Sequence, residues 1–235
     1  MNTKMKRILY ISIAVNILLV LLIVLPFLKN DTADAVVQKL NGVQRLQFHS
    51  YERTTLFDEL PIPTDATVFL GDSLTFRTEW SELFPEKTVI NRGIGGDTTE
   101  GVLERLDDVT QADPKQIFLL IGVNDLKRKS VASTIHNYER IVQRIQTESP
   151  ETELFIQSLL PVDNHKYGDV VSNDKIRQLN KELRLLAEDF GVTFIDLYSV
   201  FEENGQLPEM YTADGIHLTG KGYILWRETI KEYVR

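Results

Sequence analysis

The 235-residue chain contains no cysteine, and this absence excludes disulfides, thiolate metal sites and a thiol nucleophile. Histidine is scarce, with four copies in the whole sequence. Basic residues are also fewer than acidic ones: the chain beyond residue 29 carries 22 lysines and arginines and 34 aspartates and glutamates. A domain of this charge is a poor partner for nucleic acid or for anionic lipid headgroups.

One long apolar run covers residues 8–28 and is interrupted only by Ser12, Asn16 and Pro26. Its length suits a membrane-spanning helix. Basic residues precede it and acidic residues follow it, so the N-terminus is expected in the cytoplasm and the rest of the chain outside. We therefore predict a cytoplasmic tip and transmembrane anchor over residues 1–29 of a single-pass membrane protein. The alternative is a signal peptide, with secretion after cleavage near Ala35, because residues 33–35 read Ala-Asp-Ala.

Residues 30–50 are predicted to form a tether that runs into a helix, and residues 51–235 to form one domain with a full core. Apolar runs of strand length alternate there with stretches of helical periodicity. The expected strands cover 67–70, 88–91, 116–121, 154–160 and 192–197, and the expected helices cover 98–109, 131–146, 175–190 and 219–234. This alternation predicts an α/β fold with a doubly wound, five-stranded parallel sheet, in the flavodoxin-like order 2-1-3-4-5 by analogy.

Polar residues follow the expected strands at one edge of this sheet. The first strand leads into Gly-Asp-Ser with Ser73, the second into a glycine-rich turn that begins with Gly93, and the third into Gly-Val-Asn-Asp with Asn124. An Asp-Gly-Ile-His segment near the C-terminus adds Asp214 and His217. Ligands of open α/β sheets bind at the carboxyl ends of the strands, so these side chains are candidates for one site.

Each residue type has a role in nucleophilic catalysis. The Ser73 hydroxyl is a nucleophile once a base takes its proton, and His217 is the candidate base. Asp214, three residues earlier, can orient the imidazole and stabilise its charged form. The N–H groups of Gly93 and Ser73 and the amide of Asn124 are candidate donors to an oxyanion. His165, in a loop at the same edge, and Asp72 are possible substrate contacts.

Structural roles are the alternative for each of these residues taken alone. Ser73 could cap a helix, the glycines could make a tight turn, and Asn124 could form an Asx-turn. Asp214 and His217 could be a local hydrogen-bonded pair. The functional interpretation depends on all these residue types occurring together, each at a strand end or before a helix.

The four segments resemble the sequence blocks of the SGNH, or GDSL-type, hydrolases, and are most similar to the platelet-activating-factor acetylhydrolase-like branch. The resemblance covers about residues 50–235. It implies a three-layer α/β/α fold and ester hydrolysis through an acyl-serine, with no metal and no cofactor. It assigns Ser73, Asp214 and His217 to the catalytic triad, and Gly93 and Asn124 to the oxyanion hole. This branch favours short acyl groups such as acetyl.

Other chemistries fit the sequence less well. A metal hydrolase using the aspartates at 72, 97, 125 and 214 would have one histidine available and no tight ligand spacing. Near matches to a P-loop at 215–222 and to a dinucleotide-binding turn at 93–98 each lack a required residue.

We therefore expect a serine esterase that cleaves short acyl esters of carbohydrate or lipid outside the cell membrane. A lipase or lysophospholipase, or an O-acyltransferase, could use the same triad. The non-enzymatic alternative is a catalytically silent surface module that binds glycans or lipids.

Overall fold

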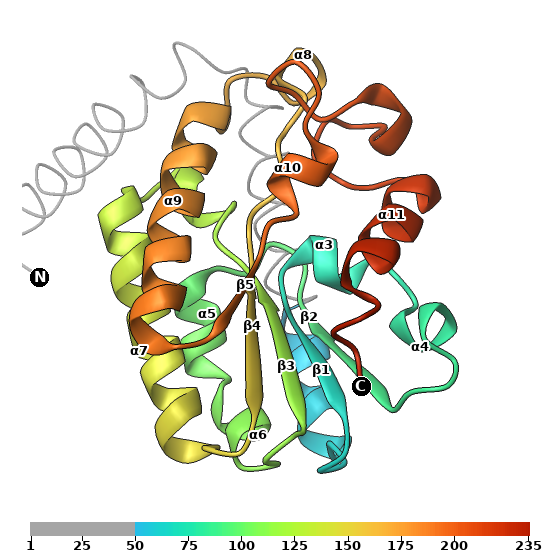
Figure 1. Cartoon of the computed structure of the whole chain (residues 1–235), viewed down its shortest axis with the longest axis vertical. Helices are drawn as coiled ribbons and strands as arrows, with labels where there is room; N and C mark the ends of the chain where they lie inside the picture. The colour runs from blue at the N-terminus through green and yellow to red at the C-terminus, as the bar shows by residue number, and fades with distance from the viewer. Residues whose placement is uncertain (1–49) are drawn as a thin grey trace, which may run out of the picture. The chain divides into compact units, whose positions relative to one another are not determined.

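The computed structural model describes residues 50–235 (Figure 1). Among these residues, no helix is both long enough and apolar enough to cross a bilayer. The anchor and nearly all of the tether predicted above lie outside the described residues, so both stay predictions. Residues 50–59 are helical, and this helix ends shortly before Pro61 because proline cannot continue a helix.

A five-stranded parallel sheet forms the centre of the described chain. Its strands pair in the order β2-β1-β3-β4-β5, which confirms the predicted topology. In register, Gly71 at the end of β1 lies between Gly93 and Leu120. The strands are β1 (Thr67–Gly71), β2 (Val89–Gly93), β3 (Gln116–Leu120), β4 (Glu153–Gln157) and β5 (Thr193–Ile195).

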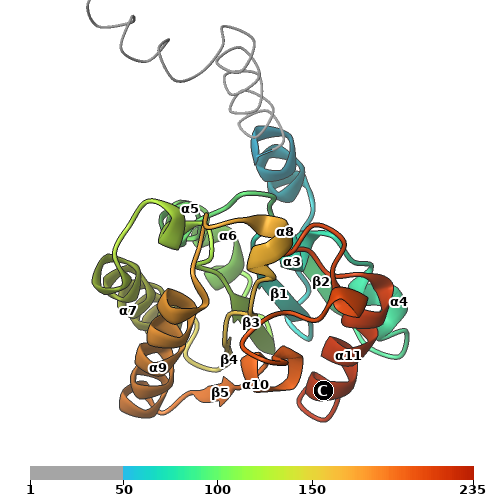
Figure 2. The same ribbon diagram turned by 90° about the horizontal axis from the view of Figure 1, so that it is seen from above.

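Helices cover both faces of the sheet, so the fold has three layers (Figures 1 and 2). Successive residues of a strand point to opposite faces, so Val68 and Leu70 pack into one core and Phe69 into the other. The first core is completed by α5 (Thr99–Glu104), α6 (Asp107–Thr110), α7 (Val131–Glu148) and α9 (Asn173–Phe190). The second is completed by α4 (Trp80–Leu83), α10 (Tyr198–Phe201) and α11 (Gly220–Ile230).

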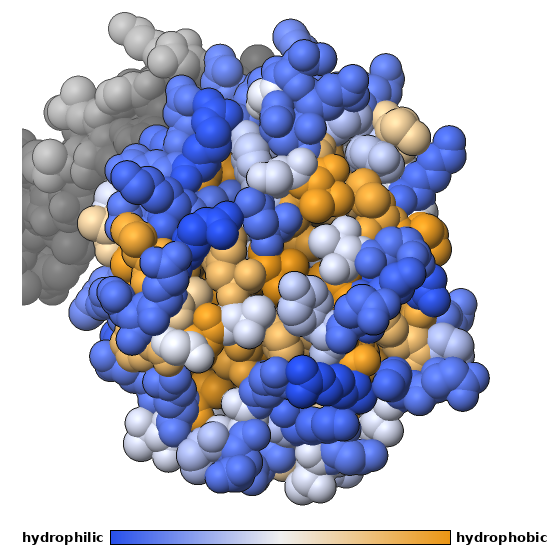
Figure 3. Space-filling view, in the orientation of Figure 1, coloured by the Kyte–Doolittle hydropathy of each residue, from blue (hydrophilic) through white to orange (hydrophobic). Residues whose placement is uncertain are grey.

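The second core is rich in aromatic rings. The rings of Phe69 and Trp80 stack with centroids 3.7 Å apart, and Trp226 of α11 meets Trp80 edge-on at 5.1 Å. Burying a large apolar side chain contributes about 1.5–3 kcal/mol, so these contacts hold the C-terminal helix firmly against the start of the domain. On the face seen in Figure 3, apolar side chains gather in the middle, over β4, β5 and α10, and polar ones cover the surrounding helices.

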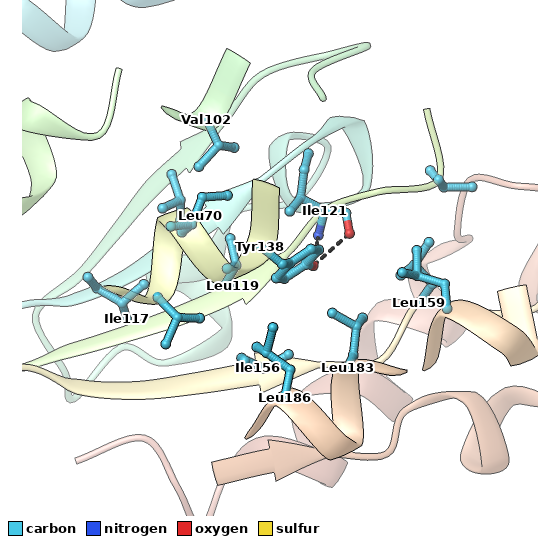
Figure 4. Close-up of a cluster of buried hydrophobic side chains, with 14 of the residues drawn as sticks. Leu70, Val102, Ile117, Leu119, Ile121, Tyr138, Ile156, Leu159, Leu183 and Leu186 are labelled. Atoms are coloured by element: carbon cyan, nitrogen blue, oxygen red, sulfur yellow. Dashed lines mark hydrogen bonds between the residues drawn. The ribbon is translucent and has the colours of Figure 1, made fainter. Parts of the chain in front are cut away.

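Tyr138 of α7 fixes the chain where β3 ends (Figure 4). Its ring is fully buried in the first core. Its hydroxyl donates to the Ile121 carbonyl at 2.6 Å and accepts from the Ile121 N–H at 3.2 Å. Both backbone groups of Ile121 are therefore satisfied by one side chain, at the point where the strand turns into the segment that carries Asn124.

Two predicted elements differ from the structure at points where a side chain bonds to a distant part of the chain. The apolar stretch 154–160 stops being a strand after Gln157, since the Asn180 side chain accepts from Leu159 N at 2.8 Å and donates to Leu159 O at 2.9 Å. The predicted helix 98–109 is interrupted between α5 and α6 at Arg105, whose side chain reaches back to the carbonyl of Gly71. By contrast, the predicted helix 175–190 ends as expected, because Gly191 caps α9 in a left-handed conformation, with φ of 65°.

Candidate active site

Ser73 is presented by a sharp turn between β1 and the short helix α3 (Ser73–Phe76). The Asp72 carboxylate accepts a hydrogen bond from Leu74 N at 2.9 Å and so caps α3. Gly71 is required there, because a Cβ atom on it would collide with the carbonyl oxygen of Leu120. The turn places Ser73 at the carboxyl end of β1, where α3 begins (Figure 1).

A hydrogen-bonded relay connects Ser73 to Asp214. The Ser73 Oγ atom lies 3.0 Å from His217 Nε2, and His217 Nδ1 lies 2.6 Å from Asp214 Oδ2. Because a carboxylate only accepts, Nδ1 carries the ring proton and the lone pair of Nε2 faces the serine hydroxyl. The structure thus brings together the three predicted triad residues from positions 144 residues apart in the chain.

Local contacts set the ionisation of this relay. Burial works against ionisation of Asp214, but hydrogen bonds from the ring and N–H of His217 and from Ile216 N–H outweigh it and lower the pKa of the carboxyl to about 2. Burial lowers the pKa of His217, and the positive charges of Arg77 and Lys127 lower it further against the effect of Asp214. At neutral pH the imidazole is therefore neutral, which is the state of a general base.

Asn124 precedes the 3₁₀ turn η1 (Asp125–Lys127) and is half-buried. Its amide donates to the carbonyl of Asp97 at 2.9 Å, and its carbonyl oxygen accepts from Lys127 Nζ at 2.7 Å. One amide hydrogen stays available for a ligand. The N–H of Ser73 likewise has no acceptor within residues 50–235. Both predicted donors are thus free to bind an oxyanion.

The prediction for Gly93 needs correction. Its N–H donates to the side chain of Asn91 at 2.9 Å, and a Cβ atom on it would collide with the backbone of Phe76. Gly93 therefore serves the close packing of β2 against α3 and does not offer its N–H to an oxyanion.

Gly96 is the better donor in the same turn. It has a positive φ of 79°, is exposed, and its N–H has no acceptor in the described part of the chain. It directly precedes Asp97, whose carbonyl accepts a hydrogen bond from the Asn124 amide, so the same turn carries this N–H and contacts Asn124. From the sequence alone, any of the glycines at 93, 95 and 96 could supply the oxyanion donor. Their backbone conformations and hydrogen bonds in the structure distinguish them.

The two predicted substrate contacts lie in different surroundings. Asp72 is fully buried, so the expectation that it contacts substrate is wrong. Burial raises the pKa of this carboxyl to about 7, and its second oxygen has no hydrogen-bond partner. His165 is exposed on α8 (Asn164–Tyr167), which packs against the turn at Gly215 through the Asp163 N–H to Gly215 carbonyl bond of 2.8 Å. Its contact with substrate stays a prediction.

Asp125 and Asp97, which the sequence offered only as metal-ligand candidates, bond instead to protein groups near the site. The Asp125 carboxylate accepts from Thr99 N at 3.0 Å and from Thr99 Oγ1 at 2.6 Å. Asp97 pairs with Arg105 at 2.8 Å. These aspartates are thus engaged with protein groups, and residues 50–235 contain no cluster of three or more side chains suited to a metal ion.

Comparison with known proteins agrees with this geometry. Residues 69–225 match the model of the GDSL-like Lipase/Acylhydrolase family. Platelet-activating factor acetylhydrolase IB subunit alpha2 of Rattus norvegicus is 33% identical over 164 residues, which cover 66% of this chain and 70% of that protein. The human subunit alpha1 is 30% identical, with 66% of this chain and 69% of that protein covered.

Solved structures give the same result. A structure from Streptococcus pneumonia described as a platelet activating factor aligns with a TM-score of 0.77 and 32% identity, over 87% of this chain and all of that one. A GDSL-like lipase from Bacteroides thetaiotaomicron aligns with a TM-score of 0.67 and 25% identity, over 79% and 96% of the two chains. The chain therefore belongs to the GDSL-like lipase/acylhydrolase family, as a serine hydrolase of its platelet-activating-factor acetylhydrolase-like branch.

Proposed function

We propose that this acylhydrolase removes short, acetyl-type acyl groups from carbohydrate or lipid esters outside the cell membrane to which its N-terminus anchors it. The observation that carries the proposal is the relay from Ser73 through His217 to Asp214, with free donors next to it. The acetyl preference is supported by the relatives, which are named as acetylhydrolases. The location rests on the apolar run at 8–28 and its flanking charges.

Acylation begins when Ser73 Oγ attacks the ester carbonyl carbon and its proton passes to His217 Nε2. The carbonyl oxygen becomes an oxyanion, which the N–H groups of Ser73 and Gly96 and the amide of Asn124 bind. Asp214 stabilises the imidazolium that forms. The tetrahedral intermediate then collapses, the alcohol leaves with the proton from Nε2, and the acyl group stays on the serine.

Deacylation repeats these steps with water. His217 Nε2 takes a proton from a water molecule, whose oxygen attacks the acyl-serine carbonyl. The second intermediate releases the carboxylic acid and returns the proton to Ser73 Oγ. An O-acyltransferase would run the same step with a sugar hydroxyl in place of water.

Hydrolysis of p-nitrophenyl esters from acetate to palmitate by the full-length protein in detergent tests the proposal. We expect turnover that falls with chain length and is abolished by Ser73→Ala. Ser81→Ala, an exposed serine on α4, is the matched control and should keep full activity. Turnover that rises with chain length would favour a lipase or lysophospholipase. Folded protein without Ser73-dependent turnover would favour the transferase or the binding module.

A protease added to intact cells tests the location. We expect it to degrade the domain while a tag on the cytoplasmic N-terminus stays protected. The mass of the mature protein distinguishes an uncleaved anchor from a chain shortened near Ala35.

A further inference from the structure

The helix at residues 50–59 precedes the part of the chain, residues 69–225, that matches the family model. Within this helix only Phe57 is buried. It is 5% exposed, whereas its neighbours Leu56 and Asp58 are exposed. Phe57 belongs to neither of the two apolar cores, so something other than apolar side chains covers its ring.

Three guanidinium groups lie over the Phe57 ring. The Cζ atoms of Arg53, Arg92 and Arg105 lie 4.7, 4.5 and 6.0 Å from its centroid. Arg105 pairs with Asp97 at 2.8 Å, but neither of the other two arginines has an ion pair within residues 50–235. Their Nε atoms are buried and have no hydrogen-bond partner. The electron-rich face of the ring thus takes the place of an anion beside these buried charges.

The three cations also repel one another, so they depend on the ring to stay together. Burial lowers the pKa of Arg92, and the positive charges of Arg53 and Arg105 lower it further. Burial likewise lowers the pKa of Arg53, and the charge of Arg105 adds to the effect. Without the π electrons of Phe57, one carboxylate would face three guanidinium groups, and we expect these groups to move apart.

Arg105 is the member of this cluster that reaches the active site. Its Nη2 atom donates to the Gly71 carbonyl at 3.2 Å, and its Nε atom donates to the Asp97 carboxylate at 2.9 Å. Gly71 lies two residues before Ser73, and Asp97 directly follows Gly96. One buried guanidinium therefore joins the two turns that supply the backbone donors of the oxyanion hole.

The same contacts extend to the third donor. The Asp97 carbonyl accepts a hydrogen bond from the Asn124 amide at 2.9 Å. A shift of Asp97 would therefore move the acceptor that orients this amide. Through Phe57 and Arg105, the helix at residues 50–59 is thus connected to every donor of the oxyanion hole.

We propose that Phe57 is a positioning residue for the oxyanion hole, because its ring holds Arg105 against Gly71 and Asp97. The inference rests on the proposed acyl-serine chemistry, in which an oxyanion forms during both acylation and deacylation. It holds for any ester that the enzyme cleaves. A helix outside the region of the family match is then part of the catalytic unit.

Fluorination of the ring separates the electrostatic role of Phe57 from its size. Replacement of Phe57 by 3,4,5-trifluorophenylalanine keeps the ring but withdraws electrons from its face, which weakens its attraction for guanidinium groups. We expect kcat for p-nitrophenyl acetate, measured with the full-length protein in detergent, to fall by about three- to ten-fold, with KM nearly unchanged. Phe57→Leu removes the ring and should lower kcat by about ten- to a hundred-fold, as misplacement of oxyanion donors predicts.

Phe84 provides the matched control. It is 7% exposed in the second core, and within residues 50–235 no cation lies over its ring. Trifluorophenylalanine at position 84 and Phe84→Leu should both leave kcat unchanged, although Phe84→Leu lowers stability.

A double-mutant cycle tests whether Phe57 acts through Arg105. Arg105→Lys keeps the charge but cannot reproduce both bonds of the guanidinium, so it should lower kcat. In that background Phe57→Leu should add little, because both changes disturb the same contacts.

A wild-type kcat in the fluorinated protein would overturn the inference, as would a loss confined to KM. Effects of Phe57→Leu and Arg105→Lys that multiply in the double variant would also overturn it. If Phe57→Leu does not fold, the fluorinated protein decides, since it keeps the packing of the ring. Absence of Ser73-dependent turnover in the wild type would instead overturn the proposed function.

Discussion

The hydroxyl of Tyr138 offers a direct test of how the core supports the site. Tyr138→Phe keeps the buried ring and removes one oxygen, so no sizeable cavity forms. It leaves the N–H and the carbonyl of Ile121 without their partner in a fully buried environment. An unsatisfied buried polar group costs about 1–3 kcal/mol, so two groups with partial relaxation should lower the free energy of unfolding by about 2–4 kcal/mol.

Urea titration followed by circular dichroism measures this loss. Tyr233→Phe is the control, because its exposed ring meets Phe155 of the second core edge-on and its hydroxyl has no partner within residues 50–235. It should change stability by less than about 0.5 kcal/mol. Since Ile121 leads into the Asn124 turn, Tyr138→Phe should also lower kcat more than it raises KM. An unfolding free energy equal to that of Tyr233→Phe would refute the proposed clamp.

Three further predictions concern the site itself. Asp214→Asn should lower kcat by about 10³–10⁴-fold, because an amide can hold His217 in the wrong tautomer. Asn124→Ala should lower kcat by about 10²–10³-fold through loss of one oxyanion donor, with little change in KM. Asp72→Asn should change the pH dependence of stability. The folded-state pKa of Asp72 is about 7, above the ordinary value of 3.8, so the folded wild type loses stability as pH rises through that window, by up to about 4 kcal/mol. The asparagine variant keeps the cap on α3 and should lack this loss.

Each of these predictions has a result that would contradict it. An Asp214→Asn enzyme with wild-type kcat would mean that another group orients the imidazole. An Asn124→Ala effect confined to KM would place Asn124 in substrate binding instead of transition-state stabilisation. Urea titrations at pH 5 and pH 8 should show a larger difference for wild type than for Asp72→Asn; equal differences would mean that the Asp72 carboxyl does not titrate in the folded state.

The order of the sheet and the triad were predictable because their signals are local. Each strand is a short apolar run, and Ser73 and His217 are marked by their neighbours in the chain. The prediction that β4 continues beyond Gln157 was wrong because the contacts that end the strand come from a distant part of the chain. Leu159 is buried and apolar, as in a strand, but Asn180 supplies its hydrogen bonds from 21 residues away.

The oxyanion hole shows a second limit of sequence reasoning. Two of its three donors are backbone N–H groups, and every glycine of a Gly-Ile-Gly-Gly turn has one. Only the fold determines that the N–H of Gly93 is taken by Asn91 and that the N–H of Gly96 is free. Likewise, Asp72 has the same polar side chain in the sequence as any surface aspartate, and its burial follows from the packing around β1.

The separation of Ser73 and His217 along the chain has a consequence for the life of the protein in the cell. A ribosome completes the nucleophile 144 residues before it completes the base, and α11, whose Tyr223 hydroxyl binds the Leu74 carbonyl of α3 at 2.9 Å, comes later still. Nascent or truncated chains therefore hold the serine without the group that activates it. If export precedes folding, as the proposed location implies, the enzyme stays inert in the cytoplasm and begins to cleave esters only when its last helix has docked.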